Sequence, residues 1–322
     1  MSWKIKLLVI IISFGLFSCR NHEKGVHPDK MLTSEGTAYS NRDHLIEAEE
    51  LRNIIGQEGF KVVHFGKPEH YNDGHIEGSI NIWRKDIEDP NYPYKGMIAS
   101  VNQIEHLFSK LGIRNSDTLI VYDNVGSCDA SRLWWVLENY DFHNIRILNG
   151  GLDAWLQAGG KLVKERTILK ESNFELTKNP SMRLYLTKEQ LLGKLNDSAN
   201  PIVMDTRTHE EFSGIRQKDG AVSGGRIPGS ISMDWAGCIN YDGDRKFKDF
   251  ETLDNIYSSI IVDQDKEVIV YCHSGTRSSL TTFVLTELLG YKNVKNYDGS
   301  WVEWSSFEEY PIIKDSITTI FN

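Results

Sequence analysis

The sequence has few cysteines and a shortage of positive charge. It contains 4 cysteines in 322 residues, and no two of them have Cys-x-x-Cys spacing. A disulfide scaffold, a zinc ribbon and a thioredoxin-type motif are therefore excluded. Acidic residues outnumber basic residues by 45 to 36, which argues against a nucleic-acid-binding protein because phosphate contacts need clustered positive charge. The length predicts two domains with substantial cores.

No apolar run is long enough for a comfortable transmembrane helix, which needs about 20 residues. The run at 7–16 follows Lys4 and Lys6 and ends shortly before Cys19. Residues 1–18 thus resemble a bacterial lipoprotein signal peptide, and an ordinary signal peptide or an uncleaved anchor is the alternative. This pattern predicts a lipid on Cys19, a polar tether at 19–42, and a membrane-anchored protein on the periplasmic or cell-surface side.

Two parts of the remaining sequence repeat each other. The run GHIEGSI at 74–80 returns as GRIPGSI at 225–231, and LIVY at 119–122 returns as VIVY at 268–271. The second offset, 149 residues, also carries three single residues onto identical partners, namely Asn144 onto Asn293, Gly150 onto Gly299 and Trp155 onto Trp304. Matches at a constant offset predict a duplicated domain, because chance agreement at so many positions is improbable.

The two copies span residues 43–160 and 182–318, with a linker at 161–181. Apolar strands alternate with helical patterns in both copies. The predicted strands are 60–65, 118–122, 145–148, 201–205, 267–271 and 294–297, and the helices include 101–111, 278–289 and one opened by a capping box at 187–190. This order predicts an α/β fold of two tandem domains. Each would have a mainly parallel β-sheet with helices on both faces.

The chemistry-bearing segment lies between the strand at 267–271 and the next helix. It consists of Cys272, His273, Ser274, Gly275, Thr276, Arg277 and Ser278. Its small residues let the loop curl so that backbone N–H groups point inward, and such a nest at a helix N-terminus binds an anion. The same field and the charge of Arg277 favour the Cys272 thiolate. The loop therefore predicts an activated nucleophile with an anion held against it.

These motifs resemble the tandem-domain rhodanese family of thiosulfate and 3-mercaptopyruvate sulfurtransferases. The resemblance rests on Cys-x-x-Gly-x-Arg at 272–277, on Asp205-Thr206-Arg207, and on the motifs at 225–230 and 299–301. It implies that Cys272 carries sulfur as a persulfide, from thiosulfate or 3-mercaptopyruvate to cyanide or a thiol, without a metal or an organic cofactor. In this family the pair equivalent to Asp205 and Arg207 mainly braces the loop.

The length of the loop at 272–277 distinguishes this chain from phosphatases that resemble its fold. Phosphatases that resemble this fold place five residues between cysteine and arginine, whereas here Arg277 comes one residue earlier and Ser278 takes the sixth position. The shorter loop favours a sulfur atom over a tetrahedral phosphate. A Cys-dependent phosphatase or arsenate reductase is therefore the less favoured enzyme. A non-catalytic lipoprotein that binds a partner or senses sulfide is a further alternative.

The second copy has an insertion at 214–224, which contains Arg216 and Lys218. Family members with a longer loop carry substrate-binding basic residues here, so Arg216 is a candidate supporting residue. Arg226, before Ile-Pro-Gly, is interpreted mainly as scaffold. Six positions after Asp205 stands Glu211, where some two-domain members have a donor-binding arginine. The usual anion contact is thus missing.

The first copy differs at the decisive position. Asp123 aligns with Cys272 and cannot carry sulfane sulfur, so this copy is predicted to be catalytically inert and to wall one side of the site. Cys128 is interpreted as a packing cysteine. Cys238 is interpreted as a half-buried bystander, and a resolving or redox thiol is the less favoured alternative. His273 either adds charge to the loop or points to solvent.

Overall fold

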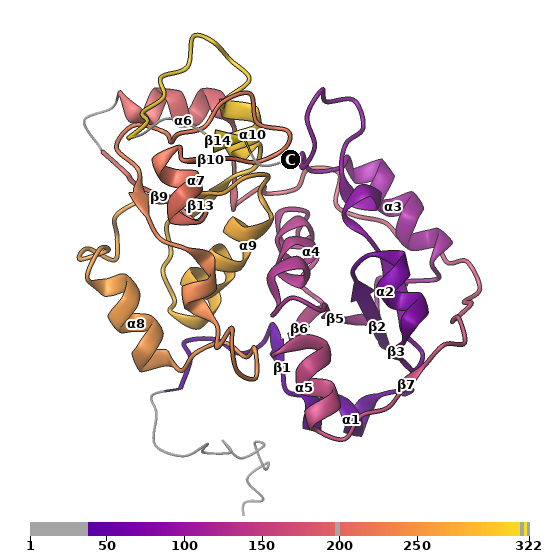
Figure 1. Cartoon of the computed structure of the whole chain (residues 1–322). Coiled ribbons are helices and arrows are strands. Elements are labelled where there is room, and N and C mark those ends of the chain that lie inside the picture. The colour runs from indigo at the N-terminus through magenta and orange to yellow at the C-terminus, as the bar shows by residue number, and fades with distance from the viewer. Residues whose placement is uncertain (1–37, 197–199, 316–318, 321–322) are drawn as a thin grey trace, which may run out of the picture. The chain divides into compact units, whose positions relative to one another are not determined.

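The computed structural model describes residues 38–196, 200–315 and 319–320 (Figure 1). The predicted signal peptide, Cys19 and most of the tether lie outside the described residues. Among the residues described, no helix is both long and apolar enough to span a bilayer.

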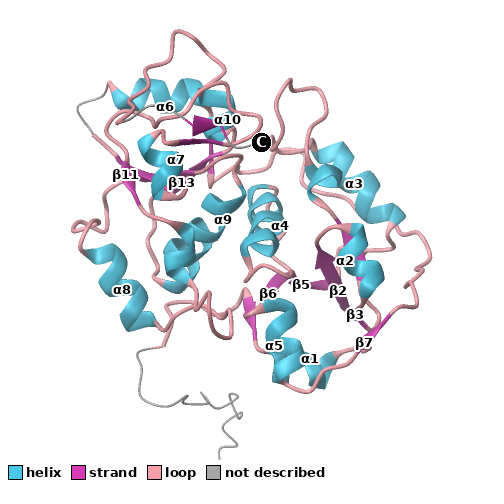
Figure 2. Ribbon diagram, viewed as in Figure 1, coloured by secondary structure: helices cyan, strands magenta, loops and turns pink. Residues whose placement is uncertain are grey.

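Strands and helices alternate along the chain, as the sequence pattern predicts (Figure 2). The N-terminal domain contains β1 (Leu45–Ile46), α1 (Ala48–Ile54), β2 (Phe60–Phe65), α2 (Pro68–Asp73), β3 (His75–Ile76), β4 (Ile80–Ile82), the 3-10 helix η1 (Arg84–Ile87), α3 (Val101–Lys110), β5 (Thr118–Tyr122), α4 (Cys128–Asn139), β6 (Ile145–Leu148), α5 (Gly151–Gln157) and β7 (Leu162–Val163). The C-terminal domain contains β8 (Tyr185–Leu186), α6 (Lys188–Leu195), β9 (Ile202–Asp205), α7 (His209–Ser213), β10 (Arg216–Gln217), β11 (Ile231–Ser232), the 3-10 helix η2 (Trp235–Cys238), α8 (Phe250–Ser258), β12 (Val268–Tyr271), α9 (Thr276–Phe283), the π-helix η3 (Val284–Leu288), β13 (Val294–Tyr297), α10 (Ser300–Trp304) and β14 (Thr319–Ile320).

Each domain is built on a five-stranded sheet. The strand order is β1-β6-β5-β2-β4 in the N-terminal domain and β11-β9-β12-β13-β8 in the C-terminal domain. Every neighbouring pair in both sheets is parallel. Because the strands are parallel, the loops that follow β5 and β12 both lie at the carboxyl ends of the strands of their own sheet. Functional loops of such folds lie at this edge. The predicted fold class is confirmed.

Side-chain alternation along the strands separates the two faces of each sheet. In β5, Leu119 and Val121 join the large core that includes α3 and α4, whereas Ile120 and Tyr122 pack with α1 and α5. The sheet of the C-terminal domain is divided in the same way, with α8 and α9 on one face and α6 and α10 on the other. Burial on both faces explains why the strands read as continuous apolar runs.

Helices α4 and α9, the helices that follow the two equivalent loops, lie side by side between the domains (Figure 1). All twelve residues of α4 are buried, and Trp134 meets Phe283 edge to face with ring centroids 4.9 Å apart. A single apolar cluster therefore runs from one domain into the other. This packing brings the N-terminal ends of both helices, and the loops before them, to the domain interface.

Two local predictions deserve comparison with the structure. The capping box is confirmed, since Thr187 Oγ1 accepts from Gln190 N at 3.2 Å and Gln190 Oε1 accepts from Thr187 N at 2.9 Å. The helix expected at 278–289 begins earlier, at Thr276, because Gly275 in the left-handed region at φ 77° starts it directly after the loop.

Within 161–181, the connecting segment packs on the N-terminal domain, where Phe174 lies between Phe108 and Phe142.

Candidate active site

Cys272 lies at the carboxyl end of β12, a central strand of its sheet, and only 1% of its surface is exposed. Ser300 braces the loop that follows, because its Oγ accepts from the backbone N–H groups of Cys272 and Gly275, each at 3.1 Å. Asn296 Nδ2 donates to the carbonyl oxygen of Gly275 at 3.3 Å. The loop is thus held by the two segments that follow it in the chain, β13 and the start of α10.

Gly275 is required where it stands. A Cβ atom at this position would lie 2.8 Å from Arg132 Nη1 and 2.8 Å from the carbonyl oxygen of Asp298. Arg132 belongs to α4 of the N-terminal domain, and its Nη2 donates to Asp298 Oδ1 at 2.6 Å in a fully buried ion pair. The other oxygen of Asp298 accepts from Ile98 N at 2.8 Å. The N-terminal domain therefore supports the catalytic loop through buried polar contacts.

The loop stabilises the Cys272 thiolate. Burial raises the pKa of the thiol, but the charge of Arg277 and hydrogen bonds from Ser278 and from the backbone of Ser274 outweigh it, so the pKa is lowered overall. The Ser278 hydroxyl is buried and has no hydrogen-bond partner among the described residues, so it is available to donate to the Cys272 thiolate, whose pKa it lowers. A thiolate held in a nest of donors at the start of a helix is the reactive form of cysteine.

Arg277 is paired with Glu211, which stands at the position of the arginine that the resemblance implies for some two-domain members. Its Nη1 and Nη2 donate to the two carboxylate oxygens of Glu211 at 2.7 and 2.9 Å. Burial would raise the pKa of Glu211, but Arg277 lowers it to about 2. The departure at Glu211 thus has a structural consequence, since the two hydrogen bonds fix the orientation of the Arg277 guanidinium.

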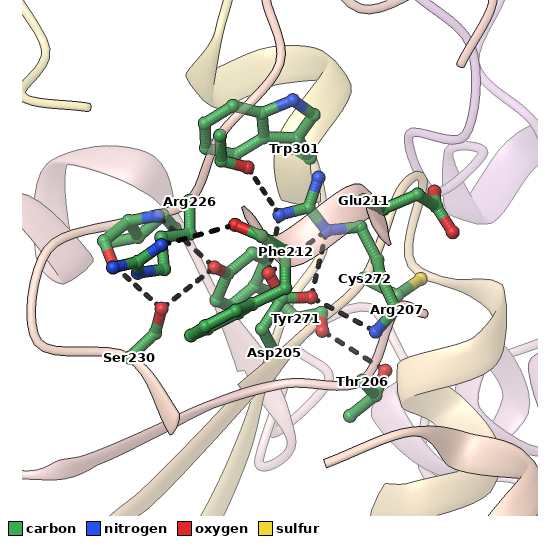
Figure 3. Close-up of polar contacts among 12 residues, drawn as sticks. Asp205, Thr206, Arg207, Glu211, Phe212, Arg226, Ser230, Tyr271, Cys272 and Trp301 are labelled. Atoms are coloured by element: carbon green, nitrogen blue, oxygen red, sulfur yellow. Dashed lines mark hydrogen bonds and ion pairs between the residues drawn. The ribbon is translucent and has the colours of Figure 1, made fainter. Parts of the chain in front are cut away.

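The buried pair of Asp205 and Arg207 braces the sheet edge beside the loop (Figure 3). Arg207 Nε donates to Asp205 Oδ1 at 2.8 Å, and Arg207 Nη2 donates to the carbonyl oxygen of Gly225 at 2.7 Å. The guanidinium lies 4.5 Å from the ring centroid of Trp301 and 5.6 Å from that of Tyr271. Neither charged residue lines the pocket at Cys272, so the pair has a supporting position.

The two other candidate arginines also lie away from the sulfur. Arg226 forms a two-pronged ion pair with Asp315, at 2.7 and 2.8 Å. Its guanidinium also lies over the ring of Phe212 (Figure 3). Arg216 lies exposed on β10 and does not line the pocket. From the same insertion, Lys218 is the basic residue that lines it.

A pocket of about 180 Å³ opens above Cys272, and both domains line it. Its lining residues are Arg84, Val125, Cys128 and Asp129 from the N-terminal domain and Lys218, Trp235, Tyr241, Cys272, His273, Ser274, Thr276 and Arg277 from the C-terminal domain. The prediction that the N-terminal domain walls one side of the site agrees with this set. Sequence reasoning missed Arg84, Trp235 and Tyr241, because no motif links them to the loop and only the domain packing brings them there.

His273 neither adds charge nor points to solvent, the two options that the sequence left open. Its ring is buried, and Nε2 lies 2.9 Å from the carbonyl oxygen of Asp219. Burial and the nearby charge of Lys218 lower the pKa of His273 to about 4, so the ring is neutral at neutral pH and donates from Nε2. His273 thereby ties the insertion at 214–224 to the catalytic loop.

The equivalent loop of the N-terminal domain is closed by its own side chain. The carboxylate of Asp123 accepts four backbone N–H groups, from Val125, Ser127, Asp129 and Ala130, at 2.7 to 2.9 Å. Its nest therefore already holds an anion. Burial, together with the charge of Asp129, raises the pKa of Asp123 to about 6.

The remaining cysteines differ in their surroundings. Cys238 is buried against Tyr257, with Sγ 2.8 Å from the hydroxyl oxygen, and burial raises its pKa to about 12. Cys128 packs in the interdomain core, as predicted, and in addition lines the pocket. Burial raises the pKa of Cys128 well above its ordinary value, which keeps it a neutral thiol. In the described part of the chain, no group of three or more His, Cys, Asp or Glu side chains is placed to hold a metal ion.

One family model and several known proteins match most of this chain. A family model described as the rhodanese-like domain matches residues 47–158 and again 187–307. A thiosulfate sulfurtransferase of Corynebacterium glutamicum is 31% identical over 282 residues, which cover 85% of this chain and 91% of that protein. The sulfur carrier protein TtuD of Thermus thermophilus is 33% identical over 255 residues, which cover 76% of this chain and 87% of that protein.

Solved structures share the fold. An anaerobic ergothioneine biosynthesis enzyme from Chlorobium limicola aligns with a TM-score of 0.75 at 21% identity, over 87% of this chain and 72% of that chain. The protein YnjE aligns with a TM-score of 0.71 at 23% identity, over 85% of this chain and 70% of that chain. At these identities the likeness concerns the fold alone.

Proposed function

The chain belongs to the rhodanese family and is a sulfurtransferase, and we propose that it moves sulfane sulfur from thiosulfate to a thiol or to cyanide through a persulfide on Cys272. The observation that carries the proposal is the buried Cys272 thiol, whose pKa is lowered by Arg277, Ser278 and the loop backbone. The name of the Corynebacterium relative supports thiosulfate as the donor.

The proposed reaction has two half-reactions through one covalent intermediate. The Cys272 thiolate attacks the outer sulfur of thiosulfate, the bond between the two sulfur atoms of the donor breaks, and sulfite leaves with the electron pair. The loop N–H groups and Arg277 stabilise the resulting persulfide anion. A cyanide ion or a thiolate then takes the outer sulfur and regenerates the Cys272 thiolate, so the kinetics are ping-pong.

The Arg277–Glu211 pair argues against a phosphatase or an arsenate reductase. A phosphatase loop needs the guanidinium fork of its arginine to face the bound oxyanion. Here both terminal nitrogens of Arg277 donate to Glu211. The loop is also one residue shorter than a phosphatase loop, so its pocket suits a single sulfur atom better than a tetrahedral phosphate.

The test of the proposal is the mass of the intact protein after incubation with thiosulfate. We expect a gain of one sulfur atom on Cys272, removal of that sulfur by cyanide as thiocyanate, and no gain in Cys272→Ser. Rates with 3-mercaptopyruvate measured beside those with thiosulfate identify the preferred donor. Release of phosphate from an aryl phosphate without any detectable persulfide would refute the assignment.

The proposal places the enzyme on a membrane through lipid on Cys19, on the periplasmic or cell-surface side. Its support is the sequence pattern at 1–19, where two lysines precede a short apolar run and a cysteine. The protein should fractionate with membranes, and Cys19→Ala should release it or block its processing. Recovery of the wild type from the cytoplasm with Met1 intact would contradict this placement.

A further inference from the structure

The position of Glu211 raises the question of how this pocket holds an anionic donor. Arg277 forms an ion pair with Glu211, with Nη1 and Oε2 2.7 Å apart. The donor-binding arginine that some two-domain members have at the Glu211 position is missing from this chain. Thiosulfate carries its sulfur on a sulfonate group, so the group needs positive partners elsewhere in the pocket. Two further cations line the pocket, namely Arg84 and Lys218.

Arg84 comes from the catalytically inert domain. It is the first residue of η1, and Nε donates to Asp129 Oδ1 at 3.0 Å, with a second contact from Nη2 to the same oxygen. The guanidinium also lies 5.2 Å from the ring centroid of Trp83. These contacts fix its orientation. Both hydrogen bonds to Asp129 use Nε and Nη2 and leave Nη1 outside the pair, and 35% of the side chain is exposed, so the guanidinium can also contact a ligand.

The closed nest of the N-terminal domain sets the position of Arg84. The backbone N–H of Asp129 donates to Asp123 Oδ2 at 2.7 Å, and the side chain of Asp129 in turn holds Arg84. Asp123, which replaces the cysteine in this domain, thus anchors the start of α4 and the carboxylate that orients the arginine. Through this chain of contacts, a loop without a nucleophile supplies a cation to the other domain's pocket.

Lys218 lines the pocket from the C-terminal domain. It lies next to Asp219, whose carbonyl oxygen is held by His273 at 2.9 Å. No direct ion pair joins Lys218 to another described residue, although Glu211 attracts it from a distance. Burial and the charges of Arg277 and Arg84 lower the pKa of Lys218, so a bound anion between these cations would relieve their repulsion.

Lys218 belongs to the insertion where the resemblance to the family already implies substrate-binding basic residues. We propose that Arg84, from the other domain, completes a subsite with Lys218 that holds the sulfonate group of the donor while its outer sulfur meets Cys272. This subsite rests on the proposed sulfur transfer only for the identity of the donor. The anion contact beside Cys272, to which both domains contribute, can be measured without turnover.

The test compares two alkylating reagents that differ in charge. Iodoacetate is an anion and iodoacetamide is neutral, so the ratio of their rates at Cys272 reports the attraction of the pocket for anions. We expect Arg84→Gln and Lys218→Gln each to lower this ratio by roughly tenfold, while the iodoacetamide rate changes by less than about threefold. Arg84→Lys should retain part of the ratio, because it keeps the charge without the fork.

Matched controls are the exposed residues Arg114 and Lys161, which do not line the pocket. Arg114→Ala and Lys161→Ala should leave the ratio unchanged. Lys218→Gln keeps the test decisive if Arg84→Gln folds poorly, because it leaves no carboxylate without its partner. An unchanged ratio in both pocket variants would overturn the subsite, and an equal fall with both reagents would mean that these residues act on the thiolate instead.

Steady-state kinetics distinguish the source of the anion. If the subsite holds a sulfonate, Arg84→Gln should raise KM for thiosulfate by roughly tenfold and change kcat much less. A rise in KM confined to 3-mercaptopyruvate would overturn the sulfonate assignment. Absence of turnover with both donors would refute the proposed function, while the alkylation ratio would still decide the anion contact.

Discussion

The two equivalent loops, 123–130 and 272–279, show how one backbone arrangement serves two purposes. Both follow a central parallel strand and precede a helix at the domain interface. In the N-terminal domain the nest is filled from within, because the carboxylate of Asp123 accepts four N–H groups. In the C-terminal domain the corresponding side chain is a thiol, and the donors stabilise its thiolate. The identity of one residue therefore decides whether the nest is structural or chemical.

A second difference lies at the position of Ser300. The offset of the repeat places Gly151 there in the N-terminal domain, and Leu152 N donates to the carbonyl oxygen of Asp123 just as Trp301 N donates to that of Cys272. Only Ser300 has a hydroxyl that accepts from two loop N–H groups. The loop of Cys272 is thus braced by a side chain from outside it, whereas the loop of Asp123 is braced by its own aspartate.

The largest expected effect comes from exchanging the decisive residue. Cys272→Ser should lower turnover by more than about 1,000-fold, because the nucleophile is lost. Asp123→Ala should keep kcat at saturating thiosulfate within about twofold under conditions where the variant is folded, and its effect through Arg84 should appear in KM. The loss of an acceptor for four N–H groups should lower the free energy of unfolding by at least about 1–3 kcal/mol. Steady-state rates and urea unfolding measure the two quantities. A large fall in kcat of folded Asp123→Ala would contradict the assignment of a structural role to the loop of Asp123 and a chemical role to the loop of Cys272.

Removing the loop cation should have the next largest effect. Arg277→Ala should slow sulfur loading from thiosulfate by about 100–1,000-fold, which corresponds to about 2.7–4 kcal/mol of barrier. Arg277→Lys should recover only part of the rate, since an ammonium group cannot reproduce the guanidinium fork. Single-turnover loading followed by mass spectrometry gives the rate, with Arg114→Ala as the control. Loading at the wild-type rate in Arg277→Ala would show that the loop amides alone are sufficient.

Ser300 and Gly151 provide a smaller and matched test. Ser300→Ala should lower the free energy of unfolding by about 1–3 kcal/mol, because two loop N–H groups lose their acceptor, and should raise the pKa measured by iodoacetamide alkylation of Cys272. Gly151→Ser should also destabilise the protein, since its Cβ would lie 2.5 Å from the carbonyl oxygen of Asp123. It should leave the pKa of Cys272 unchanged. Equal effects on that pKa would remove the distinction drawn here.

The smallest expected effect concerns His273, whose counterpart in the repeat is Asn124. The pKa of His273 falls from its ordinary value of 6.5 to about 4 in the folded protein, so below pH 6.5 the unfolded chain binds more protons. Lowering the pH from 7 to 5 should therefore reduce stability by roughly 2 kcal/mol through this group. His273→Asn should remove that part of the pH dependence. Urea unfolding at both pH values provides the measurement, and an unchanged slope in the variant would contradict the assignment.

Much of the catalytic half of the site could be predicted from the sequence. Cys272 and Arg277 are neighbours in the chain, and an apolar strand before them with a helix after them sets their relative positions. The bracing role of Asp205 and Arg207 was implied by the resemblance to the rhodanese family, and the structure shows the two side chains in a buried ion pair. The fold class followed from the alternation of apolar strands and helices.

The sequence by itself determined the duplicated fold, and it predicts Cys272 as the nucleophile and the N-terminal copy as inert, because each of these depends on local patterns and on a constant offset between repeats. Only the tertiary structure decided that Glu211 pairs with Arg277, that His273 is buried and neutral, and that Lys218 rather than Arg216 reaches the pocket. The contribution of Arg84 likewise depends on the packing of α4 against α9. Contacts between segments far apart in the chain depend on how two surfaces fit together, and no short sequence motif encodes that fit.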